Sequence, residues 1–233
     1  MRLRALHGWD LSPDEARALQ AELRGRVELR DGIRPDEVRL VAGVDNGYLR
    51  SDEGTTGFAA VVVLTFPALE VVEQRIASRP ATFPYVPGLL SFREAPAVLA
   101  ALEAVESEPD LFVFDAQGYA HPRRLGAASH LGLFVDRPSI GCAKSRLIGR
   151  YEEPPREPGA RTELVDRGET VGAVVRTRPS APPLFVSPGH LITVDTAVEL
   201  VLACCREGRR LPEPTRLAHD LVSTHTRALR PGR

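Results

Sequence analysis

Several residue types are scarce in this sequence, and each shortage excludes a class of protein. Three cysteines, two of them adjacent at Cys204 and Cys205, are too few for a disulfide framework and lack the spacing of a zinc site. No apolar run approaches the roughly 20 residues that a membrane-spanning helix needs, and the first residues form no apolar signal-peptide core. We therefore expect a protein of the reducing cytoplasm that does not contact membranes.

Lysine is scarcer still. Lys144 is the only lysine among 30 basic residues, and all the others are arginines. An ammonium group is a compact, strongly hydrated point charge, whereas a guanidinium group is planar and forked. A single lysine in so arginine-rich a chain indicates a position that requires the ammonium group. The alternative is a lysine that only ends a strand.

An overall excess of basic charge is also absent, since the formal net charge is −1. This excludes a surface that is basic all over, but the segment 121–150 holds six basic residues and one acid, Asp136. A local basic patch suits an anionic substrate. The hydrophobic content of 43% and the charged content of 26% are those of an ordinary globular protein. From the length we expect a single catalytic domain, residues 1–233.

The order of the predicted secondary structure indicates the fold class. Apolar runs and turn residues predict three consecutive strands, followed by alternating helices and strands and a late hairpin. The expected elements are a helix over 12–26, strands over 38–44, 55–66 and 70–76, a helix from 91, a strand over 111–115, a helix over 124–133, a strand over 139–144, a hairpin of 171–177 and 184–187, and helices over 195–206 and 215–223.

Four local signals define boundaries within this pattern. Ser12 followed by Glu15 predicts a capped start for the first helix, and Ser91 predicts the N-cap of the second. The dipeptide Asn46-Gly47 is a turn signal that ends the first strand. His190, in the sequence SPGH, is expected in a turn.

This order is that of a ribonuclease H-like fold, an α/β fold with a mixed central sheet flanked by helices. In it the first and fourth strands lie side by side. Asp45 follows the first predicted strand and Asp115 ends the fourth, so we expect both at one sheet edge, where α/β proteins place their sites. A doubly wound parallel sheet is the main alternative.

The charged residues at the ends of these elements suggest phosphodiester chemistry. Asp45 and Asp115, with Glu94 at the start of a helix, form a cluster of acids that is tolerable when a cation lies among them. Mg²⁺ is the expected ion, with Mn²⁺ as a substitute. Such a site activates water and polarises a phosphodiester, and Lys144 stabilises the charge that develops there. The alternative for each aspartate alone is a simple turn residue.

Three further residues have a functional and a structural interpretation. His219, beside Asp220 in the last helix, is either near the site or simply packed. His121 precedes Pro122 in an extended loop and either contacts phosphate or has a structural role. Tyr85, in the rigid loop PYVPG, is either a wedge between stacked bases or a ring packed against its own prolines.

Six segments together resemble the Endonuclease V family, the deoxyinosine 3′ endonucleases. They are VAGVD (41–45), FPYVPGLLSFRE (83–94), FDAQGYAHPRRLGAASHLGL (114–133), IGCAKSRL (140–147), FVSPGHLI (185–192) and RLPEPTRLAH (210–219). The resemblance implies a ribonuclease H-like fold and an enzyme that nicks strands containing inosine or deoxyinosine. The nick is expected at the second phosphodiester 3′ to the lesion, with 3′-hydroxyl and 5′-phosphate ends.

The resemblance also assigns roles to residues. Asp45 and Asp115 match the Mg²⁺-binding aspartates, Glu94 the acid that holds metal-bound water, Lys144 the electrophilic lysine, and His219 a position near the metal. The wedge residues match Pro84, Tyr85, Val86 and Pro87, and the hypoxanthine pocket matches Gly88, Leu90, Gly118, Gly126, Ala127 and Leu147. Ala116, His121 and Arg123 complete the set of expected substrate contacts.

Two departures from the family pattern leave alternatives open. The usual Asp-Gly-Gln-Gly is here Asp115-Ala116-Gln117-Gly118, which adds a methyl group beside the base, and Asn46-Gly47 replaces an aliphatic and a small polar residue. One alternative function is a catalytically weak module that binds inosine or branched nucleic acid. Another is an α/β phosphotransferase, although no glycine-rich phosphate loop follows the first strand. The expected partner is inosine-containing DNA or RNA, with the preference between the two left open, bound by a monomer.

Overall fold

The computed structural model describes residues 1–52 and 54–230. The strands are β1 (Leu40–Ser51), β2 (Gly54–Thr65), β3 (Val71–Pro80), β4 (Leu111–Phe114), β5 (Ser139–Ala143), β6 (Arg161–Asp166), β7 (Glu169–Val175) and β8 (Leu184–His190). The helices are α1 (Pro13–Leu23), α2 (Leu90–Glu103), α3 (Ala127–Val135), α4 (Val194–Ala203) and α5 (Glu213–Ala228), with short 3₁₀ turns at Arg24–Arg26 and Pro35–Glu37. None of the helices within these described ranges has the length and apolar character to cross a membrane.

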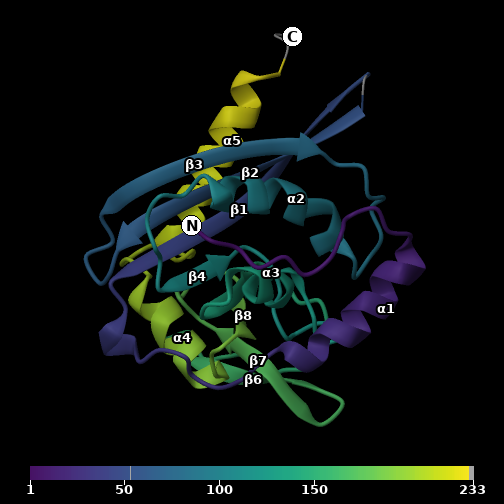
Figure 1. Cartoon of the computed structure of the whole chain (residues 1–233). Helices are drawn as coiled ribbons and strands as arrows, with labels where there is room; N and C mark the ends of the chain where they lie inside the picture. The colour runs from purple at the N-terminus through teal and green to yellow at the C-terminus, as the bar shows by residue number, and fades with distance from the viewer. Residues whose placement is uncertain (53, 231–233) are drawn as a thin grey trace.

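The eight strands form one sheet in the order β3-β2-β1-β4-β5-β8-β7-β6 (Figure 1). The first three strands are an antiparallel meander, and β1 pairs with β4 in parallel. This adjacency of the first and fourth strands confirms the ribonuclease H-like arrangement. The predicted late hairpin is confirmed by the antiparallel pairing of β7 and β8, while β6 at the sheet edge was not predicted.

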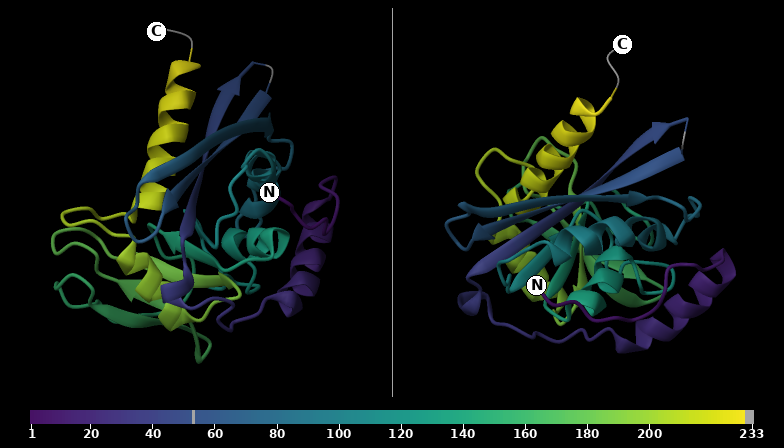
Figure 2. Two further views of the ribbon diagram at one scale, coloured as in Figure 1. Left: turned by 60° about the vertical axis from the view of Figure 1, so that its left-hand side comes forward. Right: turned by 45° about the horizontal axis from the view of Figure 1, so that its top comes forward.

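Side chains alternate between the two faces of the sheet, and each face has its own helices. Val41 packs with residues of α4 and α5, whereas Ala42 and Val44 pack with α2 and α3. In β4, Val113 belongs to the first cluster and Phe114 to the second. Figure 2 shows α5 on one side of the sheet and α2 with α3 on the other. Because the side-chain period of a strand is two, the residues that follow Val44 and Phe114 point toward α5.

Helix α5 runs along β1 and corrects the prediction for Asn46-Gly47. The first strand does not end at this dipeptide but continues to Ser51. A Cβ on Gly43 would lie 2.0 Å from the Pro214 carbonyl oxygen, and one on Gly47 would lie 3.1 Å from Val222. Four strand residues and eight helical residues both span about 12–13 Å, so the two glycines keep α5 in contact along β1. Gly47 serves this packing rather than a turn.

Of the two predicted helix N-caps, Ser12 is confirmed and Ser91 is wrong. Glu15 N donates to Ser12 Oγ at 3.3 Å and Ser12 N to the Glu15 carboxylate at 2.8 Å, which confirms the capping box of α1. The prediction for Ser91 is wrong, because α2 begins at Leu90 with Leu89 as its cap. Ser91 lies inside the helix, and its hydroxyl is 2.9 Å from His130 Nδ1.

The prediction of a turn at His190 is wrong, because this residue ends β8. It is 3% exposed, and its Nδ1 accepts a hydrogen bond from Glu28 N at 3.2 Å. The side chain therefore fixes the chain that follows α1 against the sheet. A turn signal in the sequence was outweighed here by strand pairing between β5 and β8.

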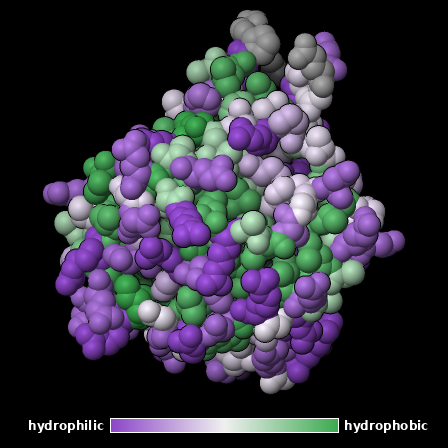
Figure 3. Space-filling view, viewed as in Figure 1, coloured by the Kyte–Doolittle hydropathy of each residue, from purple (hydrophilic) through white to green (hydrophobic). Residues whose placement is uncertain are grey.

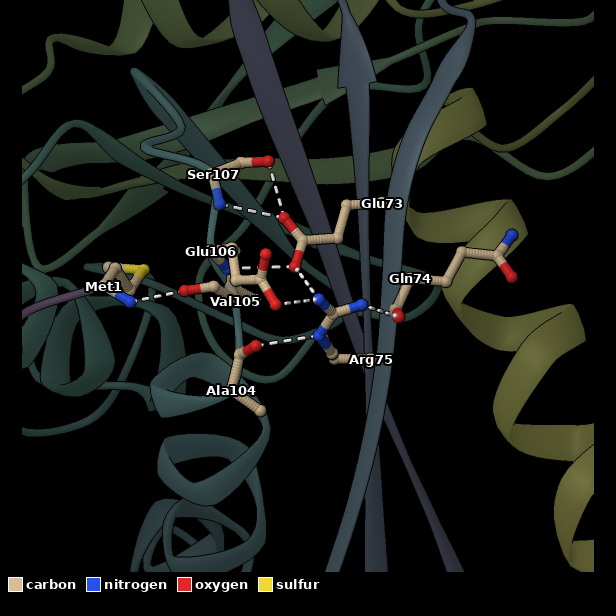
Figure 4. Close-up of polar contacts among 8 residues, drawn as sticks. All are labelled: Met1, Glu73, Gln74, Arg75, Ala104, Val105, Glu106 and Ser107. Carbon is tan, nitrogen blue, oxygen red and sulfur yellow. Dashed lines mark hydrogen bonds and ion pairs between the residues drawn. The ribbon is translucent and has the colours of Figure 1, made fainter.

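The edge strand β3 is tied to the loop after α2 (Figure 4). The Glu73 carboxylate accepts hydrogen bonds from Glu106 N and Ser107 N, both at 2.9 Å. Arg75 Nε donates to the Ala104 carbonyl at 2.8 Å. These charged side chains cover part of an otherwise open sheet edge. The face in Figure 3 mixes hydrophilic and hydrophobic residues.

Candidate active site

Two aspartates and one histidine come together where β1 and β4 lie side by side. Val44 pairs with Phe114 across the two strands, so Asp45 and Asp115 are the next residues of each. Both point toward α5, which supplies His219. One ligand atom from each of the three residues lies within 4.8 Å of the others. The topology thus groups three of the residues predicted for the site.

The electrostatics of this group favour a positive partner. Burial, and then the neighbouring Asp115, raise the pKa of Asp45 above its usual value. Two contacts oppose this: Asn46 N donates to Asp45 Oδ1 and His219 Nδ1 lies by Asp45 Oδ2, both at 2.7 Å. His219 is 46% exposed at its side chain, whereas the Asp45 side chain is 11% exposed. A pair of buried carboxylates is an unfavourable arrangement unless a cation lies between them.

Lys144 provides one such positive charge. It follows β5, the strand beside β4, just as Asp115 follows β4. Its ammonium group forms an ion pair with Asp115 Oδ2. Because the two residues end adjacent parallel strands, both emerge at the same sheet edge. The structure thus places the only lysine of the chain in direct contact with one of the predicted metal ligands.

Glu94 approaches the same edge from the other face of the sheet. It lies in the first turns of α2, and burial raises its pKa to about 8, with further contributions from Asp45 and Asp115. Tyr48 OH donates a hydrogen bond to Glu94 Oε1 at 3.3 Å, and Arg93 lies 5.2 Å from the centre of the Tyr48 ring. The charges of Asp45 and Asp115 therefore act on Glu94, although Glu94 lies outside the group that these two residues form with His219. Its predicted role with metal-bound water stays a prediction.

A cavity of about 450 Å³ adjoins the carboxylates. Asp115 and Lys144 are among the residues that line it. Ten of the predicted substrate contacts also line it, namely Tyr85, Val86, Pro87, Gly88, Leu90, Ala116, His121, Gly126, Ala127 and Leu147. Three predicted contacts, Pro84, Gly118 and Arg123, lie outside the lining. Because a Cβ on Gly118 would meet the Pro188 carbonyl oxygen at 2.2 Å, that glycine serves packing against β8.

Two glycines of the cavity need to be glycines. Gly88 has a φ of +79°, and a Cβ there would lie 2.8 Å from Arg123. A Cβ on Gly126 would lie 2.3 Å from the Gln117 carbonyl oxygen. Both positions therefore present backbone rather than side chain to the cavity.

His121 supports the loop that carries Gly88. It is 3% exposed, and burial together with Arg123 lowers its pKa to about 4. The neutral ring accepts a hydrogen bond from Arg123 N at Nδ1 (3.2 Å) and donates from Nε2 to the Gly88 carbonyl (3.0 Å). With both nitrogens in use, the structure favours the structural interpretation of this histidine over a phosphate contact.

Several residues of the site were not found from the sequence. Tyr48 contacts Glu94, and the cavity is also lined by Gln20, Ser91 and Gln117. Gln20 had a detectable signal, because it is a polar residue at the helical spacing of the buried Ala16 and Leu23. Tyr48 had none, since its position followed from a strand that continues past a turn signal.

The donor set suits a divalent cation. Two carboxylates and an imidazole lie within reach of one ion, and burial, followed by the charge of Asp115, raises the pKa of Asp45. Mg²⁺ takes a few carboxylate oxygens together with waters and substrate oxygens. Mn²⁺ accepts the same ligands and tolerates the imidazole better. The residues present therefore fit the metal predicted from the sequence.

The sheet order and the grouped carboxylates define a ribonuclease H-like protein. A family model described as Endonuclease V matches residues 21–220. The chain is 50% identical over 230 residues to an Endonuclease V of Methanothrix thermoacetophila, with 99% of each chain covered. It therefore belongs to the Endonuclease V family, a family of nucleases.

Solved structures agree with this assignment. The fold is similar to a crystal structure of Endonuclease V from Bacillus subtilis, with a TM-score of 0.92, 33% identity, and 98% and 100% of the two chains covered. It is also similar to Endonuclease V of Ciona intestinalis, with a TM-score of 0.82, 27% identity, and 93% and 98% covered. That structure is a complex with a 24mer DNA containing an inosine followed by a ribo-adenosine.

Proposed function

We propose that the protein is a Mg²⁺-dependent endonuclease that nicks nucleic acid containing inosine or deoxyinosine. The cut falls at the second phosphodiester bond 3′ to the lesion and leaves 3′-hydroxyl and 5′-phosphate ends. Residues 1–233 work as one catalytic domain, in a monomer. The observation that carries the proposal is the continuity of the cavity with the carboxylates, since Asp115 and Lys144 line the same space as Gly88 and Gly126.

The carboxylates hold the metal. Asp45 and Asp115 bind Mg²⁺ with His219 beside them, and Glu94 holds a water at the same edge. When bound, the ion supplies an activated water and a polarised phosphodiester. His219 Nδ1, at 2.7 Å from Asp45 Oδ2, fixes the orientation of that carboxylate. Mn²⁺ is the expected substitute.

Lys144 neutralises negative charge at the scissile phosphate. Its ammonium group stands beside Asp115, and both residues line the cavity. A fixed positive charge in a partly buried place stabilises the charge that builds up on the phosphorus oxygens, because less water screens it there. Arg146, which lines the cavity, and Arg123, which contacts Gly88, make the approach to the site attractive to a polyanion.

The loop before α2 separates the strands while the cavity holds the lesion base. Tyr85 is 73% exposed at the rim of the cavity, as a stacking wedge requires. Pro84 and Pro87 keep this loop rigid, Val86 packs against the cluster of Phe83 and Leu89, and a base flipped out of the stack enters the cavity behind the loop. There it meets backbone of Gly88, Gly126 and Ala127, with Leu90, Ala116 and Leu147 as apolar contacts.

Mapping of the cut tests this proposal. The substrates are matched DNA and RNA oligonucleotides with deoxyinosine, inosine or adenine at one position. A single 5′-labelled product whose 3′-hydroxyl lies on the first nucleotide 3′ of the lesion, formed with Mg²⁺ and lost with a chelator, is the expected result. Cleavage that is equal on the adenine control contradicts the assignment. The DNA and RNA arms show which strand is preferred.

A second candidate function follows from Ala116. Its methyl group lines the cavity where the family pattern has glycine, and the base then lies less close to Asp115. A catalytically weak module that binds inosine or branched nucleic acid would retain the cavity and lose turnover. Tight binding without product under either Mg²⁺ or Mn²⁺ would favour this alternative.

A further inference from the structure

Gln20 is a polar residue on the buried face of α1. This face consists of Ala16, Gln20 and Leu23, and Gln20 is only 1% exposed. A primary amide that has left water must form its hydrogen bonds inside the protein, or its burial is costly. The partners of this side chain therefore indicate its role.

Those partners lie on two different walls of the cavity. Gln20 Nε2 donates to the carbonyl oxygens of Gly88 and Leu125, at 3.1 Å in each case. Its Oε1 accepts a hydrogen bond from Arg123 Nε. Gly88 stands in the loop before α2 and Leu125 stands just before α3, and both line the cavity. One side chain thus connects the loop of residues 84–88, here called the wedge loop, with the segment that precedes α3.

The Gly88 carbonyl is the point at which the wedge loop is anchored. Besides Gln20 it accepts hydrogen bonds from His121 Nε2 at 3.0 Å and from Arg123 Nη2 at 2.7 Å. Arg123 is itself held by Gln20 Oε1. The four residues therefore form one network, and Gln20 is the member that also reaches Leu125.

Apolar packing holds α1 on both sides of this amide. Ala16 packs in a cluster with Phe83 and Leu89, at the two ends of the wedge loop. Leu23 packs with Leu125 on the side of α3. The helix, which lies at one side of the molecule in Figure 1, therefore packs against both segments, and the Gln20 amide joins them between Ala16 and Leu23.

We propose that Gln20 is a positioning residue that sets the width of the base cavity and so the discrimination between inosine and adenine. Although Gln20 lines the cavity, its hydrogen-bonding groups are used by Gly88, Leu125 and Arg123, so it acts through the backbone of the walls rather than by a hydrogen bond to the base. The proposal rests on the proposed function of the cavity. Gln20 itself precedes residues 21–220, which the family model matches.

Two variants separate this role from general packing. Gln20→Met keeps the length of the side chain and removes all three hydrogen bonds, whereas Gln20→Glu keeps the acceptor for Arg123 and removes both donors. Loss of these hydrogen bonds is expected to lower the ratio of kcat/KM for inosine to kcat/KM for adenine by about tenfold. The change appears in KM for the inosine strand, while kcat at saturation and the dependence on Mg²⁺ concentration stay at wild-type values.

The matched control is Glu22→Gln, an exposed position of the same helix, which should leave selectivity unchanged. If the methionine variant does not fold, the glutamate variant, which retains the Arg123 contact, decides. A wild-type enzyme that prefers inosine, with Gln20 variants of unchanged selectivity and KM, overturns this inference alone. A wild-type enzyme that cleaves both strands equally overturns the proposed function, and this inference with it.

Discussion

The two halves of the candidate site are held in different ways. Asp45 stands on β1 and Asp115 directly follows β4, and the backbones of these two strands pair continuously with their neighbours. The cavity is lined largely by loops, whose placement depends on single contacts such as those on the Gly88 carbonyl. Many similar backbone hydrogen bonds hold these strands in place, so the position of the carboxylates does not depend on any single side chain. Metal binding and base recognition should therefore respond separately to mutation.

The largest expected effect tests that separation at the carboxylates. Asp115→Ala removes a proposed metal ligand, and loss of several kcal/mol of transition-state stabilisation lowers kcat by about 1,000-fold or more. Binding of an inosine strand, measured by fluorescence anisotropy, should change by less than about threefold, because the cavity walls remain in place. Asp220→Asn, an exposed neighbour of His219 on α5, is the control and should keep normal turnover. Normal turnover by Asp115→Ala would contradict the proposed chemistry.

The sequence predicts the carboxylates at the strand ends better than it predicts the residues that are placed by single tertiary contacts. Asp45 and Asp115 could be placed together because strand order is a property of the whole pattern, and β1 beside β4 follows from it. The contact of His219 with Asp45, across 174 residues of chain, could only be suggested by resemblance. Ser91 and Asn46-Gly47 were misplaced because local capping and turn signals were overridden by tertiary packing.

The network around Gln20 was missed for a related reason. Its carbonyl partners belong to Gly88 and Leu125, and a backbone acceptor leaves no trace in residue type. A polar residue at a buried helical position was the only available signal. Periodicity can show that such a residue is buried, but it cannot show what lies opposite.

The second prediction tests how strand β1, which carries Asp45, responds to a methyl group added where it contacts α5. In Gly43→Ala the new methyl group would lie 2.0 Å from the Pro214 carbonyl oxygen, a backbone atom that can move only with α5. We expect a loss of about 2–3 kcal/mol in the free energy of unfolding, measured by urea denaturation, since overpacking costs this much. Gly25→Ala, where nothing lies within 4 Å, should change it by less than about 0.5 kcal/mol. Equal effects of the two substitutions would show that α5 is not held against β1.

The third prediction concerns a buried histidine under the cavity. Burial lowers the pKa of His130 from 6.5 to about 3, and its ring contacts Ser91 and His7. Because the folded state binds the proton less readily than the unfolded chain, stability is lost as the pH falls below 6.5. Between pH 7 and pH 5 this amounts to about 2 kcal/mol.

The measurement compares free energies of unfolding at both pH values. The stability advantage of the wild type over His130→Gln should shrink by about 2 kcal/mol from pH 7 to pH 5. Ser129→Ala, the adjacent buried position in α3, carries no titrating group, so its difference from the wild type should be the same at both pH values. A constant difference for His130→Gln would mean that the imidazole does not stay neutral in the folded protein.

The smallest expected effect lies in the cavity itself, at Ala116. Ala116 lines the cavity and packs partly against the α2 and α3 side of the core. Ala116→Gly removes its methyl group, and kcat/KM for an inosine strand should rise by roughly fivefold, since a methyl-sized change in a pocket has an effect of about 1 kcal/mol. Ala68→Gly, at an exposed loop position, controls for the added backbone freedom of glycine. A fall in kcat/KM at Ala116→Gly alone would show that the methyl group supports the base instead of crowding it, and that the loop half of the site has adapted to alanine.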